Sequence, residues 1–223
     1  MNSKIVQDFG LYSKAKGISS LNLHYYNQKI EDSMTPYVLE ERQMNVTQID
    51  VFSRLMLERI IWASGEVNDQ MSTIIQAQLM FLDSLDNNDI TMHIDSPGGS
   101  VKSGLSMVDV MEYIKSDIRT INTGMAASMG SVLLGAGTKG KRGSLRFSRT
   151  MLHQSSGGFR GNIQDAKIDM IEWEKLNNIL FELLGGYCGK SGDQVKKDAS
   201  RDLWLDSQDA LDYGIIDEIV KRK

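Results

Sequence analysis

The sequence predicts an α/β fold with a parallel sheet, because segments with strand patterns alternate along the chain with segments of helical spacing. Two observations carry this prediction. The strand candidates are short and apolar, and motifs of glycine and other small residues, at 96–99 and 124–130, follow two of them. In folds of this kind, binding and catalytic sites gather where strands end and helices begin. Chemistry is therefore expected at those two motifs.

The first strand and helix lie between residues 59 and 85. Residues 59–63 form a short apolar run that ends at a Ser-Gly pair, which is typical of a buried strand. Residues 72–85 carry apolar side chains at helical spacing, among them Ile75, Leu79 and Leu82. A second strand is predicted over 90–95, where Ile90, Met92 and Ile94 alternate with polar residues.

The same order then repeats. The pattern over 103–114 predicts a helix, with either Tyr113 or Ile114 completing its apolar stripe. A strand over 119–123 is followed by a predicted turn at Gly124 and a helix over 128–134, and residues 145–153 can supply another strand.

The longest predicted helix covers residues 162–184. Asn162 is a good N-cap, and the pair Gly185-Gly186 is expected to stop the helix. Its apolar side chains recur every three or four residues: Ala166, Met170, Trp173, Leu176, Leu180 and Leu183. A helix of this length would be unusually exposed on a compact monomer.

The N-terminal residues differ from the rest of the chain. Residues 1–31 are polar and lack periodicity, so they are predicted to be an extension or a prosegment that is poorly ordered by itself. An appendage that stays attached fits the pattern equally well. A short segment over 32–51 follows, and residues 52–223 are expected to form one domain.

Composition narrows the classes of function. The 223-residue chain is 41% hydrophobic and has a net charge of −4, which gives no basic surface for nucleic acid. One cysteine, Cys188, excludes an internal disulfide, and without an apparent signal or membrane segment the chain is expected in the cytoplasm. The sequence has no zinc-type spacing and no P-loop, so no cofactor is predicted and any ATP would be used by a partner.

A serine among small residues is the strongest candidate for chemistry. Ser128 lies in Gly-Met-Ala-Ala-Ser-Met-Gly, where small neighbours allow close approach of a substrate and a helix start favours developing negative charge. His153 can act as its base, and a carboxylate can orient that histidine. Asp202 is the candidate for this carboxylate, in competition with Asp198, Asp206 and Asp209. Taken alone, the serine is more often a helix cap and the histidine a structural residue.

Four motifs, in order and with their spacing kept, resemble ClpP, the ATP-dependent caseinolytic serine peptidase subunit. They are Asp-Ser-Pro-Gly-Gly-Ser-Val at 95–101, the motif at 124–130, Met-Leu-His-Gln at 151–154, and Arg201-Asp202. The tail at 209–217 is similar as well, and the resemblance runs from about Thr35 to the C-terminus.

This resemblance implies a crotonase-like fold of repeated β-β-α units, with residues 162–184 as a protruding handle helix. It implies a catalytic triad of Ser128, His153 and Asp202 in a serine endopeptidase that cleaves unfolded polypeptides. The N–H groups of Gly99 and Met129 would form the oxyanion hole. Residues 32–51 would line an axial pore.

The resemblance also implies partners. ClpP subunits self-associate into two stacked seven-membered rings, so a homo-oligomeric tetradecamer is expected, with Arg201, Trp173 and Leu180 at subunit contacts. An AAA+ unfoldase such as ClpX, ClpA or ClpC would use the ATP and deliver unfolded protein substrates. No nucleic acid or membrane partner is implied, and a paralogous ClpP subunit in the same ring stays open.

Two departures from ClpP stand out. Ser155 replaces the proline that usually follows His-Gln, which frees the backbone of the substrate-cradling strand. Thr91, His93 and Thr123 are polar where the unfoldase-docking pocket is usually apolar, although Ile121 and Leu145 can supply part of it. Poor docking of a foreign unfoldase is therefore predicted, with a cognate ATPase or a paralogous ring providing the docking face.

Two other classes of function remain open at this point. A crotonase-type acyl-CoA enzyme has the same fold and a paired-amide hole but lacks the triad. A mainly structural ring subunit would have lost its triad, whereas Ser128, His153 and Asp202 are all present here.

Overall fold

The computed structural model describes residues 37–42, 45–155 and 162–221, and for residues 37–48 it describes the backbone. The predicted extension, residues 1–31, lies outside this range. The chain divides between Leu55 and Met56 into two compact units. The smaller unit holds an antiparallel hairpin of β1 (Tyr37–Arg42) and β2 (Asn45–Asp50), and α3 (Val51–Leu57) begins within it.

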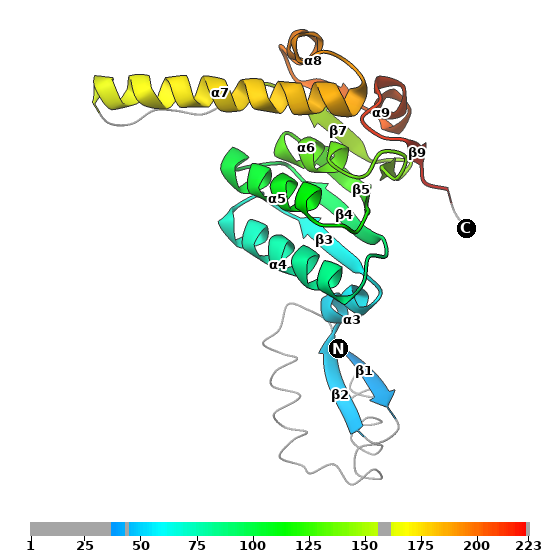
Figure 1. Ribbon diagram of the computed structural model, residues 1–223. Coiled ribbons are helices and arrows are strands. Elements are labelled where there is room, and N and C mark those ends of the chain that lie inside the picture. Colours follow the sequence, from blue (N-terminus) through cyan, green and yellow to red (C-terminus); the bar gives the residue numbers. More distant parts are fainter. Residues whose placement is uncertain (1–36, 43–44, 156–161, 222–223) are drawn as a thin grey trace, which may run out of the picture. The chain divides into compact units, whose positions relative to one another are not determined.

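The larger unit is built on a seven-stranded sheet (Figure 1). Its main path runs β3-β4-β5-β6-β9, all in parallel, and β7 joins β5 in parallel while β8 pairs with β7 antiparallel. The strands are β3 (Ile60–Ser64), β4 (Ile90–Ser96), β5 (Ile118–Ala127), β6 (Gly143–Ser144), β7 (Arg149–Leu152), β8 (Leu203–Leu205) and β9 (Glu218–Ile219). The predicted α/β fold with a parallel core is confirmed.

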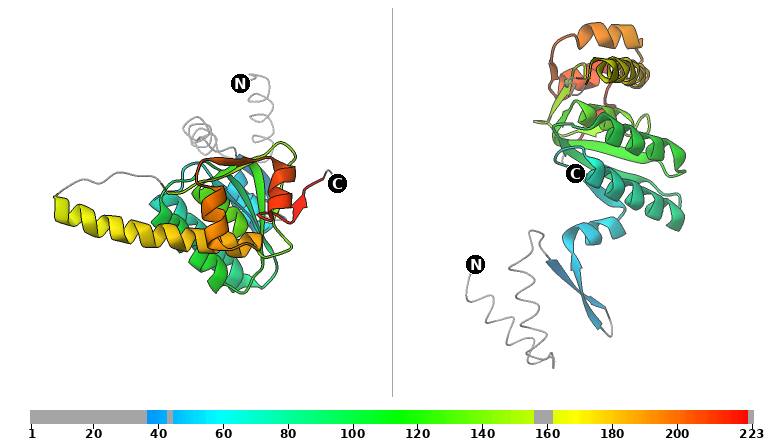
Figure 2. Two further views of the ribbon diagram at one scale, coloured as in Figure 1. Left: turned by 90° about the horizontal axis from the view of Figure 1, so that it is seen from above. Right: turned by 90° about the vertical axis from the view of Figure 1, so that its left-hand side faces the viewer.

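Helices connect these strands. Two of them, α4 and α5, pack side by side over the sheet, and the long α7 runs out beyond it (Figures 1 and 2). The helices of this unit are α4 (Asp69–Leu85), α5 (Val101–Tyr113), α6 (Met129–Gly135), α7 (Ile163–Cys188), α8 (Gly192–Asp198) and α9 (Ser207–Tyr213). Within the described ranges, no helix combines the length and apolar character needed to cross a membrane.

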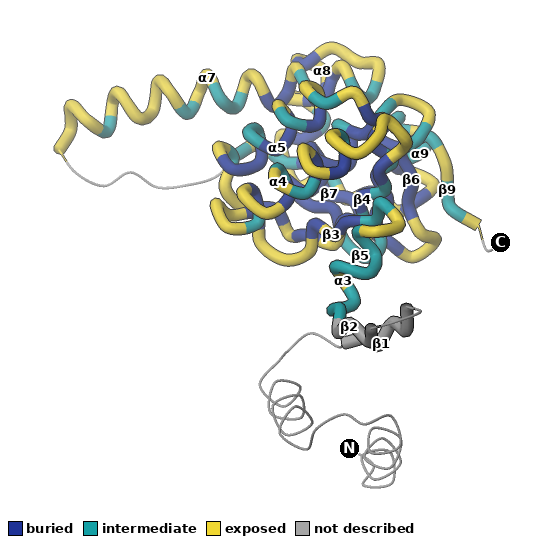
Figure 3. The backbone as a smooth tube through the Cα atoms, turned by 60° about the horizontal axis from the view of Figure 1, so that its bottom comes forward, coloured by how far each residue is buried: buried dark blue, intermediate teal, exposed yellow. Residues whose placement is uncertain are grey.

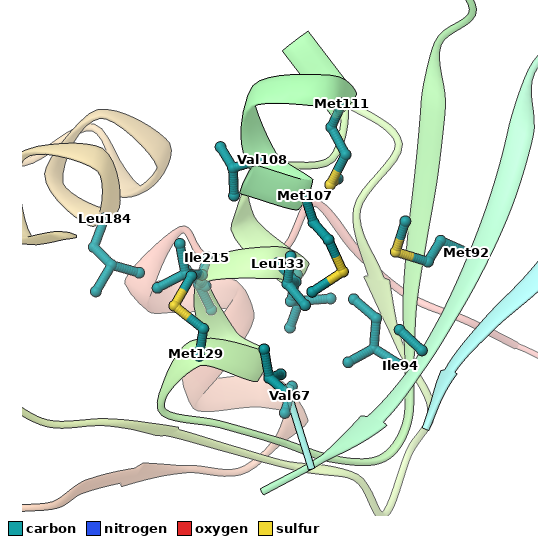
Figure 4. Close-up of a cluster of buried hydrophobic side chains, with 14 of the residues drawn as sticks. Val67, Met92, Ile94, Met107, Val108, Met111, Met129, Leu133, Leu184 and Ile215 are labelled. Atoms are coloured by element: carbon teal, nitrogen blue, oxygen red, sulfur yellow. The ribbon is translucent and has the colours of Figure 1, made fainter. Parts of the chain in front are cut away.

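The core lies between the sheet and these helices (Figure 4). The alternating residues of β4 behave as predicted, since Ile90, Met92 and Ile94 are all 0% exposed. Helices α4 and α5 contribute buried residues that their spacing indicated, together with Met107. These residues are Ile75, Leu79, Leu82, Val108 and Met111. At the end of α5, Ile114 packs against the core while Tyr113 is exposed.

The predicted turn at Gly124 is wrong. Strand β5 continues through Gly124 to Ala127, because its first half pairs with β4 and β6 and its last three residues pair with Arg149–Met151 of β7. The strand predicted over 145–153 is correspondingly shorter, and β7 comprises only Arg149–Leu152. A second set of neighbours, which local pattern does not reveal, therefore extends β5 up to the serine.

The predicted stop at Gly185-Gly186 is also wrong. Helix α7 continues to Cys188 and ends at Gly189, whose φ of 67° is in the left-handed region that glycine readily adopts. Gly185 serves packing instead, since a Cβ there would lie 2.8 Å from the backbone nitrogen of Gly192. The glycine thus allows α7 to approach the start of α8. The predicted N-cap is confirmed, because the Asn162 side chain accepts hydrogen bonds from the first turn.

Candidate active site

Ser128 lies at the sharp junction between β5 and α6. Its φ of 54° and ψ of −121° lie in a region that non-glycine residues seldom occupy, and such strain concentrates at functional sites. Its side chain makes no capping hydrogen bond to α6, so the reading of this serine as a helix cap is wrong. A serine on a strained strand-to-helix turn presents its hydroxyl outward, as in the nucleophile elbow of other hydrolases.

Small residues make this junction possible. A Cβ on Gly98 would lie 2.6 Å from the Cβ of Ser128, and one on Gly130 would lie 2.9 Å from the carbonyl oxygen of Ser96. The loop after β4 and the start of α6 therefore pack closely against each other. The Met129 side chain is buried against Gly104 of α5, which anchors the first residue of α6.

The sheet brings His153 to this serine. Strands β5 and β7 are parallel with Ala127 opposite Met151, so the residues just beyond both strands lie at the same edge. The N–H of Ser128 donates to the Met151 carbonyl oxygen at 2.9 Å. The Nε2 atom of His153 lies 2.8 Å from the Ser128 Oγ, which is within hydrogen-bonding distance.

The antiparallel pairing of β7 with β8 brings Asp202 to the other side of the imidazole. Leu152 is opposite Leu203, so His153 and Asp202 occupy facing positions just past that pair. The Asp202 Oδ1 lies 3.5 Å from the His153 Nδ1, an ion-pair distance longer than an ordinary hydrogen bond. The carboxylate is 62% exposed, whereas the imidazole is 22% exposed. The structure thus brings all three predicted residues together.

Two backbone donors flank the serine. Gly98 and Gly99 have φ values of 92° and 149°, which side-chain-bearing residues rarely adopt. Hydrogen bonds between this loop and Val67 hold it in place, since the Val67 N–H donates to Gly98 and its carbonyl accepts from Ser100. Within the described part of the chain, the N–H groups of Gly99 and Met129 donate no hydrogen bond. Both residues line the cavity beside Ser128.

A cavity of about 310 Å³ opens beside these groups. Its lining is mainly apolar, and its polar members are Ser131, Ser155 and Asn177 together with Ser128 and His153. The lining includes Ser128, His153, Gly99 and Met129 together with Val101, Val132, Leu180, Phe181 and Leu184. Leu180 is only 9% exposed and belongs to the core of its own subunit, so a contact made by this residue with a second subunit stays a prediction.

An aromatic pair that the sequence patterns did not predict lies on the other face of the sheet. Trp62 of β3 is directly opposite His93 of β4, and their rings stack with centroids 4.6 Å apart. Burial and then the nearby charge of Arg119 lower the pKa of His93, which favours the neutral imidazole. The signal in the sequence was alternation, because it places Trp62 and His93 on the sides of their strands opposite the buried residues.

The site contains a strained serine, a histidine within hydrogen-bonding distance of it, and a carboxylate on the other side of that histidine. Two backbone N–H groups lie beside the serine. This arrangement is that of a serine hydrolase. The family follows from comparison. Residues 41–223 match the family model for Clp protease. The chain therefore belongs to the Clp protease family, and it is a serine peptidase.

Curated relatives agree over nearly the whole chain, and each bears the name ATP-dependent Clp protease proteolytic subunit. The protein from Bacteroides fragilis is 46% identical over 220 residues, covering 98% of this chain and 100% of the relative. That from Bacteroides thetaiotaomicron is 45% identical over 220 residues, with the same coverage. That from Porphyromonas gingivalis is 45% identical over 207 residues, covering 92% and 93%.

Proposed function

We propose that Ser128 is the nucleophile of this peptidase, His153 its general base and Asp202 the group that orients the imidazole. The observation that carries this assignment is the 2.8 Å separation of the His153 Nε2 from the Ser128 Oγ. In the proposed reaction, the Oγ attacks the peptide carbonyl carbon while the Nε2 takes its proton. The imidazolium then gives that proton to the leaving amine, and water hydrolyses the acyl-enzyme by the reverse sequence.

The developing oxyanion would be held by the N–H groups of Gly99 and Met129. Such donors are typically worth about 10²–10³ each in rate. The cavity beside them would receive the substrate side chain that precedes the cleaved bond, and its apolar lining favours an apolar side chain there. This arrangement argues against the acyl-CoA alternative, because the donors stand beside a nucleophile and its base.

The test is the substitution Ser128→Ala. We expect peptide cleavage to fall by roughly 10⁴–10⁶, because the members of a triad act as a unit. A fluorophosphonate probe should label the wild type at Ser128 and leave the variant unlabelled, whereas an acyl-CoA enzyme would not be labelled at this serine. Ser84→Ala, at an exposed serine on α4, is the matched control and should keep both activity and labelling. Near-normal cleavage by Ser128→Ala would exclude this residue as the nucleophile.

The subunit is further proposed to act inside a larger assembly in the cytoplasm. The outer half of α7 exposes large apolar side chains that nothing in the described chain covers: Ile163, Ile168, Met170 and Ile171. Such a surface favours self-association, and two stacked seven-membered rings would bury it. Trp173 and the exposed Arg201 are proposed as further subunit contacts.

Substrate delivery is proposed to depend on a partner, an AAA+ unfoldase such as ClpX, ClpA or ClpC. The relatives are named as ATP-dependent, and the sequence has no P-loop, so the ATP would be consumed by that partner. On the docking face, Trp62 stacked on His93 supplies aromatic surface that Thr91 and Thr123 lack. A cognate unfoldase would therefore meet a differently built pocket from the one usual in ClpP. No cofactor is proposed for this chain.

A further inference from the structure

The position that ClpP usually gives to proline holds a hydrogen-bonded serine here. The Ser155 N–H donates to the Asn177 Oδ1 at 3.0 Å, and the Ser155 hydroxyl donates to the same oxygen at 2.9 Å. The Trp173 Nε1–H donates in turn to the Ser155 Oγ at 2.6 Å. Trp173 and Asn177 are one turn apart on α7, so both lie on one face of the helix and both form hydrogen bonds with Ser155.

Ser155 lies close to the proposed base in the sequence. Ser155 is two positions beyond His153, and the residue between them is also held, since the Gln154 Nε2 donates to the Ser200 carbonyl oxygen at 3.2 Å. On the other side of His153, Leu152 pairs with Leu203 in the sheet. The backbone around the imidazole is therefore tied to the Asp202 loop and to α7.

These restraints differ in what they fix. The β7–β8 pairing fixes the register of the strand that precedes His153. The hydrogen bond of Gln154 holds the chain to Ser200, two residues before Asp202. The bonds of Ser155 pull the chain in another direction, toward α7, and they do so beside the cavity that both Ser155 and Asn177 line. Proline would restrict the same backbone through its ring, and it could offer neither the N–H nor the hydroxyl.

We propose that Ser155 is a positioning residue for His153, and that Trp173 and Asn177 of α7 are the groups through which it acts. The proposal rests on the roles proposed above for Ser128 and His153. Its consequence is that α7, which also carries the exposed apolar surface, is linked to the base through Ser155. A shift of the imidazole by about 1 Å costs up to about 10²-fold in rate, so a loose segment should slow the reaction.

The experiment compares a substitution of Ser155 that removes the hydroxyl with one that keeps it. Ser155→Ala keeps the size of the side chain and removes both side-chain hydrogen bonds, and we expect kcat for a short peptide to fall about 10-fold with KM unchanged. Labelling by a fluorophosphonate probe should slow by a similar factor. Ser155→Thr keeps the hydroxyl and should restore most of both rates. These last two comparisons separate positioning from a general structural role.

A second pair of variants approaches the same contact from α7. Asn177→Ala removes the acceptor of both Ser155 bonds and should reproduce the loss in kcat. Its matched control is Asn178→Ala, at the next, exposed residue of the helix, which should behave as the wild type. Melting temperature and sedimentation are recorded for every variant, and if Ser155→Ala does not fold, Asn177→Ala carries the test.

The outcomes are distinguishable. Unchanged kcat in Ser155→Ala, equal losses in the Ala and Thr variants, or a change confined to KM would each overturn the positioning role. If wild-type Ser128 is not labelled at all, the proposed triad itself fails, and the inference falls with it. Slowed labelling in Ser155→Ala and Asn177→Ala, with Ser155→Thr and Asn178→Ala near normal, supports the inference.

Discussion

The two ends of α7 have similar apolar content and opposite surroundings (Figure 3). At the C-terminal end, Leu180, Phe181 and Leu184 are at most 9% exposed and belong to the core of the subunit. At the N-terminal end, Ile163 is 77% exposed and Ile168 is 65% exposed. Helical periodicity therefore identifies a surface that needs a partner, but the tertiary structure decides whether that partner lies in the same chain.

The C-terminal end is held by more than apolar contacts. Arg142 is only 1% exposed, and its Nη1 donates to the Tyr187 carbonyl oxygen in the last turn of α7 at 2.9 Å. The same guanidinium pairs with Asp217 at 2.7 Å and donates to the Gly214 carbonyl oxygen. One buried arginine thus joins the end of α7 to the C-terminal segment.

The largest effect on stability is expected from Asp217→Asn. This change leaves Arg142 charged and buried without its counterion, which typically costs about 3–5 kcal/mol. Urea unfolding at pH 7 measures the loss. Glu218→Gln, at an exposed acid that pairs with Arg119, is the control and should cost less than about 1 kcal/mol. Equal losses for the two variants would show that Arg142 does not depend on Asp217.

The same pair predicts a dependence on pH. Burial raises the pKa of Asp217, but the hydrogen bonds and charge of Arg142 outweigh it, and the pKa lies well below its usual value of 3.8. The contribution of Asp217 is therefore fully present above the unfolded pKa and is lost as pH falls through the folded pKa. Wild-type unfolding free energy should fall more steeply below about pH 4 than that of Asp217→Asn. Parallel curves for the two proteins would contradict this linkage.

A somewhat smaller loss is expected from Leu184→Ala. The side chain is 3% exposed, and truncating a buried leucine typically costs about 2–5 kcal/mol. Ile179→Ala lies on the same helix with its side chain 46% exposed, and it should cost less than about 1 kcal/mol. The two midpoints of urea unfolding make the comparison. If both variants lose the same stability, the described burial does not govern this end of the helix.

The smallest effect on stability, and the largest on assembly, is expected from Ile171→Glu. The residue is 58% exposed in the subunit, so the unfolding free energy of the subunit should change by only about 0.5 kcal/mol. In an apolar contact between rings, the new charge would be buried, and sedimentation should show single rings or smaller species. Lys197→Glu, on the exposed side of α8, is the control for charge alone. An undisturbed double ring in Ile171→Glu would place the ring contact elsewhere.

The sequence by itself determined the α/β class, because apolar residues recur with a period of two in strands and of three to four in helices, and both periods can be seen in short segments of sequence. Residues such as Met92 and Leu79 lie inside as their spacing indicates. The three candidate triad residues were found through a family resemblance over separated motifs, since no local pattern relates Ser128 to Asp202.

Tertiary structure alone decided the features that depend on distant neighbours. Pairing with β7 extends β5 through Gly124, and the resulting junction leaves Ser128 with a positive φ. The approach of Gly192 explains why Gly185 lies within a helix that it was expected to end. The sequence indicated a freed backbone at Ser155, but the structure shows hydrogen bonds between Ser155 and two residues of α7. Local propensity is weak compared with such packing, and the contacts that override it join residues far apart in the sequence.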